Sequence, residues 1–524
     1  MMLNKQKRPV RFFNTTGPCN PWDHYMLPPA DRIVGAQLHR YIRDNLYWVL
    51  HAPRQTGKTT FLQNWAREIN AEGTAVACYI SIEACQGITS VHDAMLTMHN
   101  VICEFARASS LPIPNIPDKE PQILLYETMR QWSQLIAPKP LSVLIDETDV
   151  LEGDVIISFL RQLRSGFSER GIGKFPISIA LVGMRDLKDY IFQSKDGTRV
   201  NPGSPFNIKQ DSATISNFSR ENIGQLFSQR TEETGQKITD EALNFVWEQS
   251  NGQPWIVNSL FSRATMRVLH EDSIDTVEID HVQKACEQMI QARETHLDAL
   301  AYRMENPEVK KIIESLIVGN SDPLLNESSG FHLAMDLGLI TLENGTPIVA
   351  NPIYREILAR QLTYGPQLAI VKPEWQWEKP DGTLDMDKLL KEFQIFWREN
   401  SEAWDERMNY TEAFPHLLLM AFLQRVLNGG GRIEREYSAG RGRMDLFVEY
   451  NTARYILELK LVHNKQSIEI VKSKGVEQTK TYRDTKAPQA SAYLILFDRR
   501  DITKTLPWEE RLYWEESDIT VVGC

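Results

Sequence analysis

The sequence predicts an α/β protein in which two different α/β regions flank a mainly helical part. Three observations lead to this prediction. Apolar runs alternate with amphipathic stretches from about residue 46 to residue 182, which is typical of a parallel sheet covered by helices on both faces. Helical periodicity dominates from Asn217 onward. Strand-like runs then return from about residue 432.

Length and composition limit the possible classes. The chain has 524 residues, too many for one core, and this predicts roughly three or four domains. No run of about 20 apolar residues occurs, and the basic N-terminal segment lacks an apolar stretch. Neither a membrane span nor a signal peptide is therefore predicted, and we expect a cytoplasmic protein.

Charge and cysteine spacing exclude further classes. The formal net charge of -11 argues against a sequence-blind polyanion binder, so any nucleic-acid contact needs a local basic patch. The cysteines form no C-x-x-C pair, which argues against a disulfide framework and a cysteine-based zinc site. The six thiols, expected to be reduced and buried, are Cys19, Cys78, Cys85, Cys103, Cys286 and Cys524.

The first 29 residues predict an N-terminal strap rather than a folded unit. Aromatic residues alternate there with prolines, a pattern of extended chain docked on a body formed by other residues. The aromatic residues are Phe12, Phe13, Trp22 and Tyr25.

A strand over residues 46–50 and an amphipathic helix enclose a predicted phosphate-binding loop. The helix places Phe61, Leu62, Trp65 and Ile69 on one face. In such a loop the backbone N–H groups surround phosphate oxygens, Lys58 reaches the β and γ phosphates, and the Thr59 hydroxyl binds Mg²⁺. The loop, which predicts ATP and Mg²⁺ as cofactors, is Ala52-Pro53-Arg54-Gln55-Thr56-Gly57-Lys58-Thr59-Thr60.

One residue departs from the usual loop pattern. Ala52 replaces the first glycine of G-x-x-x-x-G-K-[ST], which costs little if its φ is negative. Gly57, where the backbone must wrap around the β phosphate, is kept. The alternative is a chance Gly-Lys-Thr at the start of a helix.

A second strand over residues 74–80 precedes a helix over residues 90–108, and a third strand over residues 141–145 ends in two acids. This last arrangement is a Walker B pattern. Asp146 would act on the metal through its bound water, and Glu147 would polarise the attacking water. The alternative is a buried strand followed by a solvated acidic turn.

A fourth strand over residues 177–182 delivers Arg185 to the same sheet edge, where it is a candidate sensor of the γ phosphate. The alternative is a surface arginine. Arg54, Arg161 and Arg164 are further candidates for an arginine finger, and the sequence does not choose among them.

Residues 216–294 predict a helical lid. The segment contains the turn Asn251-Gly252-Gln253-Pro254-Trp255, in which Pro254 stands near the first position of a helix. Residues 295–360 predict a winged helix, with two helices and then a hairpin across Glu343-Asn344-Gly345. A winged helix is as often a protein-packing module as a DNA reader, and this one lacks an arginine-rich helix.

These motifs together resemble the bacterial AAA-like P-loop ATPases related to the STAND and origin-recognition groups. The resemblance covers roughly residues 30–360. It implies an ATPase core over residues 30–215, a lid turn whose Pro254 approaches adenine, and a nucleotide-controlled switch. The runs that carry it are 52–59, 141–147, 183–185, 204–208, 252–255 and 351–356.

Residues 361–385 predict an extended interdomain linker, because prolines and tryptophans interrupt any helical period. The domain predicted over residues 386–524 begins with two helices and continues as a three-stranded meander. Asp445 lies in the middle strand and Glu458-Leu459-Lys460 in the next one. Alternation places Glu458 and Lys460 on one face, and an antiparallel neighbour can bring Asp445 beside them.

Two carboxylates on a rigid sheet can bind Mg²⁺, and a lysine beside them can position the attacking water. Gln478 and Tyr482, one helical turn apart, are expected over the same face. The alternative is a polar sheet face with unrelated charges.

This constellation resembles the PD-(D/E)XK nuclease superfamily, a restriction-endonuclease-like α/β fold, over roughly residues 405–500. Met444 stands where the proline of the family name would be. The resemblance implies that Asp445 and Glu458 bind metal and that Gln478 occupies the place of a frequent helix glutamine. The upstream acid is Glu412, Glu434 or Glu436, with Glu436 preferred.

Basic residues are frequent in this predicted domain, and their cationic face could neutralise nucleic-acid phosphates. A solvated helix face is the alternative for Lys472 and Lys474. The residues are Arg425, Arg432, Arg435, Arg441, Arg443, Arg454, Lys460, Lys465, Lys472, Lys474, Lys480, Arg483 and Lys486.

The leading functional prediction is an ATP-controlled, Mg²⁺-dependent DNA endonuclease in bacterial antiphage defence or mobile-element biology, acting as a homo-oligomer or with a partner protein. The first alternative is an ATP-dependent regulator whose nuclease-like domain only binds nucleic acid or a partner. The second is a translocase or helicase, although no helicase motif beyond Walker A and B occurs.

Overall fold

The structure, a computed structural model, divides the chain into two compact units, Met1–Val309 with Pro323–Arg355, and Lys310–Asp322 with Glu356–Cys524. The residues that the structure describes are 11–35, 37–116, 120–184, 192–193, 199–200, 208–270, 273–291, 304, 306–318, 328–369, 377–407, 414–427, 431–435, 438–439, 442–443, 446–464, 466–498, 500 and 506–524.

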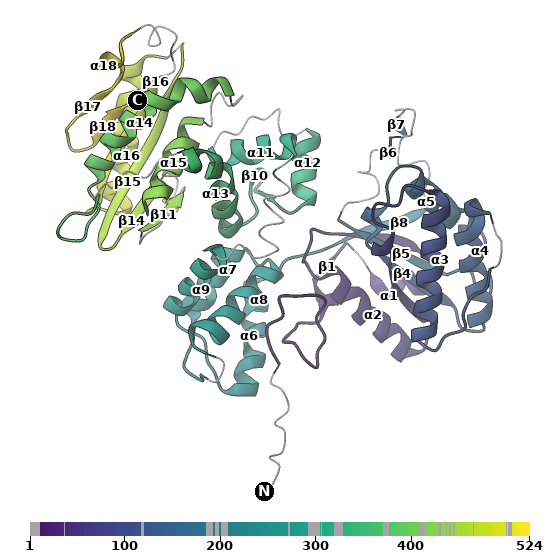
Figure 1. The fold of residues 1–524 in the computed structure, drawn as a ribbon. Coiled ribbons are helices and arrows are strands. Elements are labelled where there is room, and N and C mark those ends of the chain that lie inside the picture. Colours follow the sequence, from purple (N-terminus) through teal and green to yellow (C-terminus); the bar gives the residue numbers. More distant parts are fainter. Residues whose placement is uncertain are drawn as a thin grey trace. The chain divides into compact units, whose positions relative to one another are not determined.

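The first unit contains a mostly parallel sheet that lies among helices α1 to α5 (Figure 1). Its strand order is β1-β8-β2-β5-β4-β3, and only the two-residue β1 runs antiparallel to its neighbour. The predicted parallel sheet is confirmed, with strand ends shifted by one or two residues. The strands are β1 Ile33–Val34, β2 Tyr47–His51, β3 Val76–Ser81, β4 Leu141–Asp146, β5 Ser178–Gly183 and β8 Lys209–Ile215; β6 Phe192–Gln193 pairs with β7 Arg199–Val200 outside this sheet.

Helices cover both faces of this sheet because alternate strand residues are apolar on both sides. Tyr47 and Val49 point into a core shared with α3, α4 and α5, whereas Trp48 and Leu50 point into a core shared with α1 and α2. The helices are η1 Pro29–Arg32, α1 Leu38–Arg43, α2 Lys58–Glu72, η2 Glu83–Cys85, α3 Val91–Ala108, α4 Pro121–Ile136, η3 Thr148–Val150 and α5 Gly153–Phe167.

Helices α6 to α9 follow the sheet. Ser219 forms a capping box at the start of α6. Pro254 occupies the first position of α8, as the sequence predicts. Their bounds are α6 Arg220–Thr234, α7 Asp240–Ser250, α8 Pro254–Arg263, the π-helix η5 Ala264–Val268 and α9 Ile279–Gln291.

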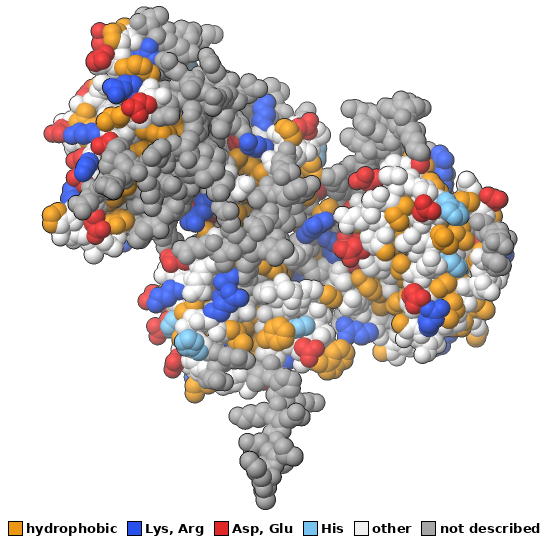
Figure 2. Space-filling view, in the orientation of Figure 1, with side chains coloured by type: hydrophobic (Ala, Val, Ile, Leu, Met, Phe, Trp, Pro, Cys, Tyr) orange, Lys and Arg blue, Asp and Glu red, His pale blue; other side chains and the backbone are white. Residues whose placement is uncertain are grey.

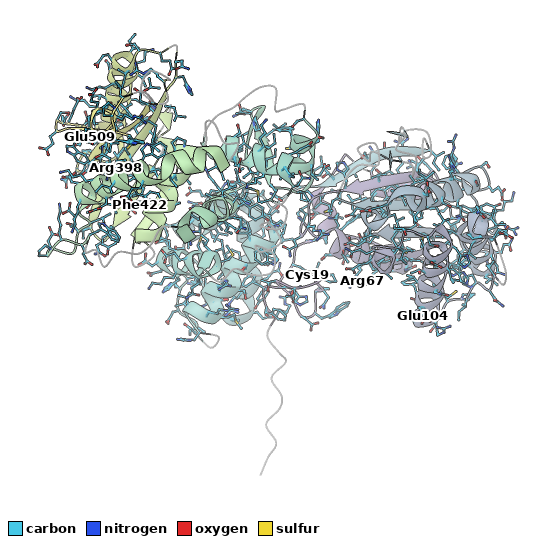
Figure 3. All side chains as sticks on the ribbon, turned by 45° about the horizontal axis from the view of Figure 1, so that its top comes forward. Cys19, Arg67, Glu104, Arg398, Phe422 and Glu509 are labelled. Atoms are coloured by element: carbon cyan, nitrogen blue, oxygen red, sulfur yellow. The ribbon has the colours of Figure 1, made fainter. Side chains whose placement is uncertain are left out.

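The described part of the N-terminal strap packs mainly on these helices. Phe13 is buried with its ring 5.7 Å from that of Phe227 and 5.0 Å from that of Phe261. The Tyr25 hydroxyl donates to Glu233 at 2.8 Å. The strap also reaches α2, because the backbone N–H of Cys19, which Figure 3 labels, donates to Thr60 Oγ1 at 3.0 Å.

The hairpin predicted at residues 343–345 is present. Glu343 pairs with Thr346, and Asn344 and Gly345 both have positive φ, as a tight two-residue turn requires. The surrounding elements are α11 Pro307–Val318, α12 Ser329–Asp336, β9 Ile340–Glu343, β10 Thr346–Val349 and α13 Pro352–Ala369.

The prediction of extended chain from residue 361 is wrong for its first part. Helix α13 continues to Ala369, because a helix that has already formed adds residues such as Gln361 and Leu362 at little cost. Residues 377–385 also dock within the second unit. The Tyr455 hydroxyl donates to the backbone carbonyl of Leu384 at 2.6 Å, and Leu384 itself is buried.

The second unit contains a mixed sheet with the order β11-β14-β15-β16-β18-β17. The first three strands form the predicted antiparallel meander, and β15, β16 and β18 run parallel. The middle strand of the meander is β14, which begins at Leu446, and the preceding β13 pairs with β12. The strands are β11 Gly431–Arg435, β12 Ser438–Ala439, β13 Gly442–Arg443, β14 Leu446–Tyr450, β15 Ala453–Val462, β16 Ser491–Asp498, β17 Tyr513–Glu515 and β18 Thr520–Gly523.

Helices cover the two faces of this sheet. On one face α16 packs over Ile456 and Leu494, and on the other Trp397 of α14 lies 4.9 Å, ring to ring, from Phe497. Phe422 of α15, labelled in Figure 3, contacts the same α14 through Phe393. The helices are α14 Met386–Arg407, α15 Phe414–Leu427, α16 Ile468–Lys486 and α18 Trp508–Arg511.

The cysteines are free thiols, as the sequence predicts. The expectation that all are buried is wrong for Cys19 and Cys103, which are half-buried. Both lie near segments without regular structure, where fewer neighbours cover them. Within the described ranges no helix has the length and apolar character needed to cross a membrane.

Candidate nucleotide site and candidate nuclease centre

The predicted phosphate-binding loop connects β2 to α2 at the carboxyl ends of the parallel strands of the first sheet. Gly57 has φ of 97° and Gln55 has φ of 60°, so the chain turns sharply at both positions. Ala52 is buried and has no positive φ, so alanine is tolerated there without strain. The loop therefore has the shape that its sequence predicts.

Lys58 is the first residue of α2 and lies inside the loop. Its Nζ donates to the backbone carbonyls of Ala52 at 2.8 Å and Pro53 at 2.9 Å. Burial lowers the pKa of Lys58, although the charge of Asp146 acts in the opposite direction. The ammonium group of Lys58 thus donates its hydrogen bonds to neutral carbonyl oxygens rather than to a carboxylate.

Asp146 ends β4 beside the loop and is almost completely buried. Its Oδ2 accepts hydrogen bonds from Thr59 Oγ1 at 2.7 Å and from the Tyr79 hydroxyl at 3.3 Å. Its Oδ1 accepts from the Glu147 backbone N–H at 3.0 Å. Burial raises the pKa of Asp146, and the hydrogen bond from Thr59 opposes this rise.

Glu147 has a left-handed backbone conformation, with φ of 62°, directly after the strand. Burial raises its pKa, and the Asp146 and Asp149 carboxylates raise it further. Such a group suits the polarisation of a water molecule. Sequence reasoning missed Tyr79, whose position near the end of the neighbouring parallel strand β3 could have indicated this contact.

The residues present fit a magnesium ion. The Thr59 hydroxyl and the Asp146 carboxylate lie side by side, and such oxygen atoms are the ligands that Mg²⁺ prefers. Thr56 supports the loop, since its hydroxyl donates to the Pro53 carbonyl at 2.8 Å. The structure therefore brings the predicted loop and both Walker B acids together.

The remaining candidates of this site have different positions. Arg54 is exposed on the loop, and Arg161 and Arg164 are exposed on α5. Pro254 is buried at the start of α8, next to Gln253, whose Nε2 lies 3.5 Å from the Gln55 carbonyl oxygen. Arg185 lies outside the described residues.

Glu458 and Lys460 lie on the same face of β15, as alternation predicts. The Glu458 side chain is fully buried, and Lys460 Nζ donates to its Oε1 at 2.6 Å. Ile456, two residues before Glu458, packs in the core under α16, so the ion pair lies on the α16 side of the sheet. This direct contact goes beyond the shared face that the sequence predicts.

Asp445 lies outside the described residues. It directly precedes Leu446, which pairs with Leu457 in the adjacent antiparallel strand, and Glu458 directly follows Leu457. Gln478 lies on α16 and donates through Nε2 to the Tyr482 hydroxyl at 2.8 Å. Of the candidates for the upstream acid, the backbone of Glu434 is part of β11, whereas Glu412 and Glu436 lie outside the described residues.

The described cations of this domain are largely paired with carboxylates. Arg483 binds Asp518 at 2.6 Å, and Lys480 lies 3.4 Å from the same carboxylate. Lys472 binds Glu515 at 2.6 Å. Basic and acidic side chains also alternate over the described surface in Figure 2. Within the described part of α16, acids from the last 15 residues therefore neutralise three of the basic residues assigned to the predicted cationic face.

Residues 410–497 match the model of the PD-(D/E)XK nuclease superfamily. Among solved structures, the Walker-type ATPase of Pyrococcus abyssi is 13% identical with a TM-score of 0.46, and the match covers 66% of this chain and 99% of that one. Cdc6p of Pyrobaculum aerophilum is 14% identical with a TM-score of 0.35, covering 63% and 91%. The Thermotoga maritima RuvB Holliday junction branch migration motor is 15% identical with a TM-score of 0.33, covering 60% and 88%.

A search of curated proteins gave no match. The loop geometry and the family match agree with the two predicted folds. The chain combines a P-loop ATPase-like N-terminal region with a C-terminal PD-(D/E)XK nuclease domain.

Proposed function

We propose that this protein is an ATP-controlled, Mg²⁺-dependent DNA endonuclease. The observation that carries the proposal is the buried ion pair between Glu458 and Lys460, which lies inside the segment that matches the nuclease superfamily. Burying a carboxylate is costly even when it is paired, so a fully buried glutamate in a sheet favours a functional role. Its partner Lys460 lies 2.6 Å away, and the two residues have the Glu-x-Lys spacing of the superfamily's signature.

In the nuclease centre, Asp445 and Glu458 would hold the metal ion, which supplies positive charge beside the scissile phosphate. Lys460 would orient the attacking water and stabilise charge on the phosphate oxygens. Gln478, fixed by Tyr482, would orient substrate or water from α16. The water oxygen forms a bond to phosphorus while the bond from phosphorus to the leaving oxygen breaks.

In the nucleotide site, the loop N–H groups and Lys58 would bind the β and γ phosphates. Lys58 can exchange the Ala52 and Pro53 carbonyls for phosphate oxygens without breaking an ion pair. Thr59 and Asp146 would hold Mg²⁺, Glu147 would polarise water, and Arg185 is the candidate γ-phosphate sensor. Slow hydrolysis suffices if the nucleotide acts as a switch.

The proposed control connects these two centres. ATP would set the arrangement of the lid and of the winged helix proposed for residues 295–360, and thereby govern access to Asp445, Glu458 and Lys460 or the oligomeric state. A role in bacterial antiphage defence or mobile-element biology rests on the resemblance of the architecture. We place the protein in the cytoplasm, as a homo-oligomer or with a partner protein.

Plasmid cleavage tests the proposal. The protein is incubated with supercoiled DNA and Mg²⁺, with and without ATP, and compared with Asp445→Ala, Glu458→Gln and Lys58→Ala. We expect cleavage that requires ATP and is absent in all three variants. Glu449→Gln is the matched control, because Glu449 also pairs with a cation, Arg454 at 2.9 Å, in the same sheet. Full cleavage by Asp445→Ala would exclude the nuclease assignment.

A further inference from the structure

Two neighbouring carbonyls of the phosphate-binding loop are held by side chains from outside the loop. Arg32 Nη2 donates to the Thr56 carbonyl at 2.9 Å. Gln253 Nε2 lies 3.5 Å from the Gln55 carbonyl oxygen, at the outer limit of a hydrogen bond. Arg32 lies 24 residues before Thr56 in the chain, whereas Gln253 lies 198 residues after Gln55.

These contacts act on the groups that would bind phosphate. A trans peptide is planar, and its C=O and N–H point in opposite directions. The Gln55 carbonyl shares a peptide plane with the Thr56 N–H, and the Thr56 carbonyl shares one with the Gly57 N–H. A donor that holds the carbonyl on one side therefore fixes the direction of the N–H on the other.

Arg32 is built into this position. Its side chain is buried, and its Nη1 donates to the Ser216 carbonyl at 2.9 Å. Its guanidinium carbon lies 4.8 Å from the ring centre of Phe218. A Cβ added to Gly57 would lie 2.8 Å from Nη2, which shows how closely the guanidinium packs on the loop.

Burial lowers the pKa of Arg32 to about 10, so the group still carries its charge at neutral pH. A buried cation is costly unless its hydrogen bonds are made. The two carbonyls of Thr56 and Ser216 supply such bonds. One planar guanidinium can bond both at once, which a lysine ammonium reproduces poorly.

The second contact closes a ring of interactions. The Phe218 N–H donates to the Gly252 carbonyl at 2.8 Å. Gly252 has φ of +71°, and a Cβ there would lie 1.9 Å from the Phe218 carbonyl oxygen, so the approach requires glycine. Gln253 comes next and caps α8 by accepting from the Ile256 N–H at 2.7 Å. The ring thus runs from the loop through Arg32 and Phe218 to Gln253 and back.

We propose that Arg32 and Gln253 are positioning residues that aim the Thr56 and Gly57 N–H groups at the nucleotide phosphates and couple the loop to residues 216–218 and 252–253. The inference rests on the proposed nucleotide site. Because such coupling is reciprocal, a bound phosphate that fixes these peptide planes also strengthens the bonds to Arg32 and Gln253. Nucleotide binding then stabilises the hydrogen bond from Phe218 to Gly252 although the phosphates contact neither residue.

The test uses the full chain and two measurements. Calorimetry gives the Kd for ADP with Mg²⁺ of the wild type, Arg32→Ala, Arg32→Lys and Gln253→Ala. We expect Arg32→Ala to raise this Kd by about 10- to 100-fold and Gln253→Ala by about 2- to 10-fold, as for loss of a charged and a weak neutral hydrogen bond. Arg43→Ala is the control, because Arg43 is a largely exposed arginine of the same unit.

The second measurement separates positioning from a purely structural role. Hydrogen exchange is followed for peptides covering residues 216–219 and 250–253, with and without saturating ADP. We expect ADP to slow this exchange in the wild type. We expect no such slowing in Arg32→Lys, which keeps the charge and most of the volume of the side chain. Melting temperatures of the free proteins show that the variants are folded.

The outcomes distinguish the inference from the proposed function. A wild type that binds no nucleotide refutes the proposed function and the inference together. A wild type that binds ADP, with Arg32→Lys and Gln253→Ala matching it in both Kd and exchange protection, overturns the inference alone. If Arg32→Lys binds ADP more weakly and loses the ADP-induced protection from hydrogen exchange, the inference is supported even if Arg32→Ala does not fold.

Discussion

The two candidate centres each contain a lysine and a buried carboxylate, but they arrange them differently. In the nucleotide site Lys58 donates to two backbone carbonyls, and Asp146 is held by Thr59 and Tyr79. In the nuclease centre Lys460 donates directly to the fully buried Glu458. The first site separates its opposite charges, and the second pairs them.

This difference indicates what each lysine does before any ligand binds. A lysine on neutral carbonyls can turn to a phosphate without leaving a carboxylate behind. A lysine paired with a buried carboxylate neutralises a charge that would otherwise be costly. We therefore expect Lys58 to contribute mainly to ligand binding, and Lys460 to contribute to the stability of its domain as well as to the proposed reaction.

The largest expected effect concerns the buried carboxylate of the second centre. Glu458→Gln keeps the shape of the side chain but removes the negative charge of a proposed metal ligand, so we expect DNA cleavage to fall by about 1000-fold, the equivalent of roughly 4 kcal/mol. Initial rates of plasmid nicking measure the loss, and nucleotide affinity serves as the internal control. Cleavage within tenfold of the wild type would show that Glu458 is only structural.

The next effect concerns Lys58. Lys58→Met should raise the Kd for ATP by about 100-fold, because a charged partner of the phosphates is removed. The same substitution should leave the stability of the free protein unchanged or slightly higher, since burial disfavours the charged lysine. Calorimetry and thermal melting measure the two quantities. A marked fall in the melting temperature would contradict the view that the ligand alone needs Lys58.

Lys460→Met, unlike Lys58→Met, should lower the stability of the free protein. Removing the partner of a fully buried carboxylate costs about 3–5 kcal/mol, and the 29% exposure of Lys460 reduces the expected cost to about 1–3 kcal/mol. Urea unfolding of the full chain, monitored by hydrogen exchange in β15, measures this loss of stability. The double variant with Glu458→Gln should recover most of the stability. Additive losses in the double variant would show that the pair does not act as a unit.

The sequence predicts most of the first site because its residues are close in the chain. A strand, the loop from Ala52 to Thr60 and a helix form one local unit, so the pattern determines the local geometry. Arg32 and Gln253 could not be found in this way. They reach the loop only through tertiary contacts. Gln253 belongs to the predicted lid turn, but no local pattern shows that this turn reaches the phosphate-binding loop.

The second centre is predicted less completely for the same reason. Alternation places Glu458 and Lys460 on one face, but their direct hydrogen bond depends on side-chain packing under α16. The basic residues of α16 suggested a cationic face from composition alone. Asp518 and Glu515 neutralise several of them from strands and turns more than 30 residues away, which no local pattern reveals.

The smallest effect tests that neutralisation. Hydrogen bonds from Arg483 lower the pKa of Asp518, so the pair contributes stability above the unfolded pKa of about 3.9, and this contribution is lost as the pH falls through the lower folded value. Asp518→Asn should therefore cost a small amount of stability at pH 7, and this cost should disappear as the pH falls below the lowered folded pKa of Asp518. Urea midpoints at several pH values measure the difference, which should be smaller than that for Lys460→Met because the Asp518 side chain is 58% exposed whereas that of Glu458 is fully buried. If Asp518→Asn and Lys460→Met instead lower the free energy of unfolding equally at pH 7, burial would not distinguish the Glu458–Lys460 ion pair from the ion pairs on the surface of the domain.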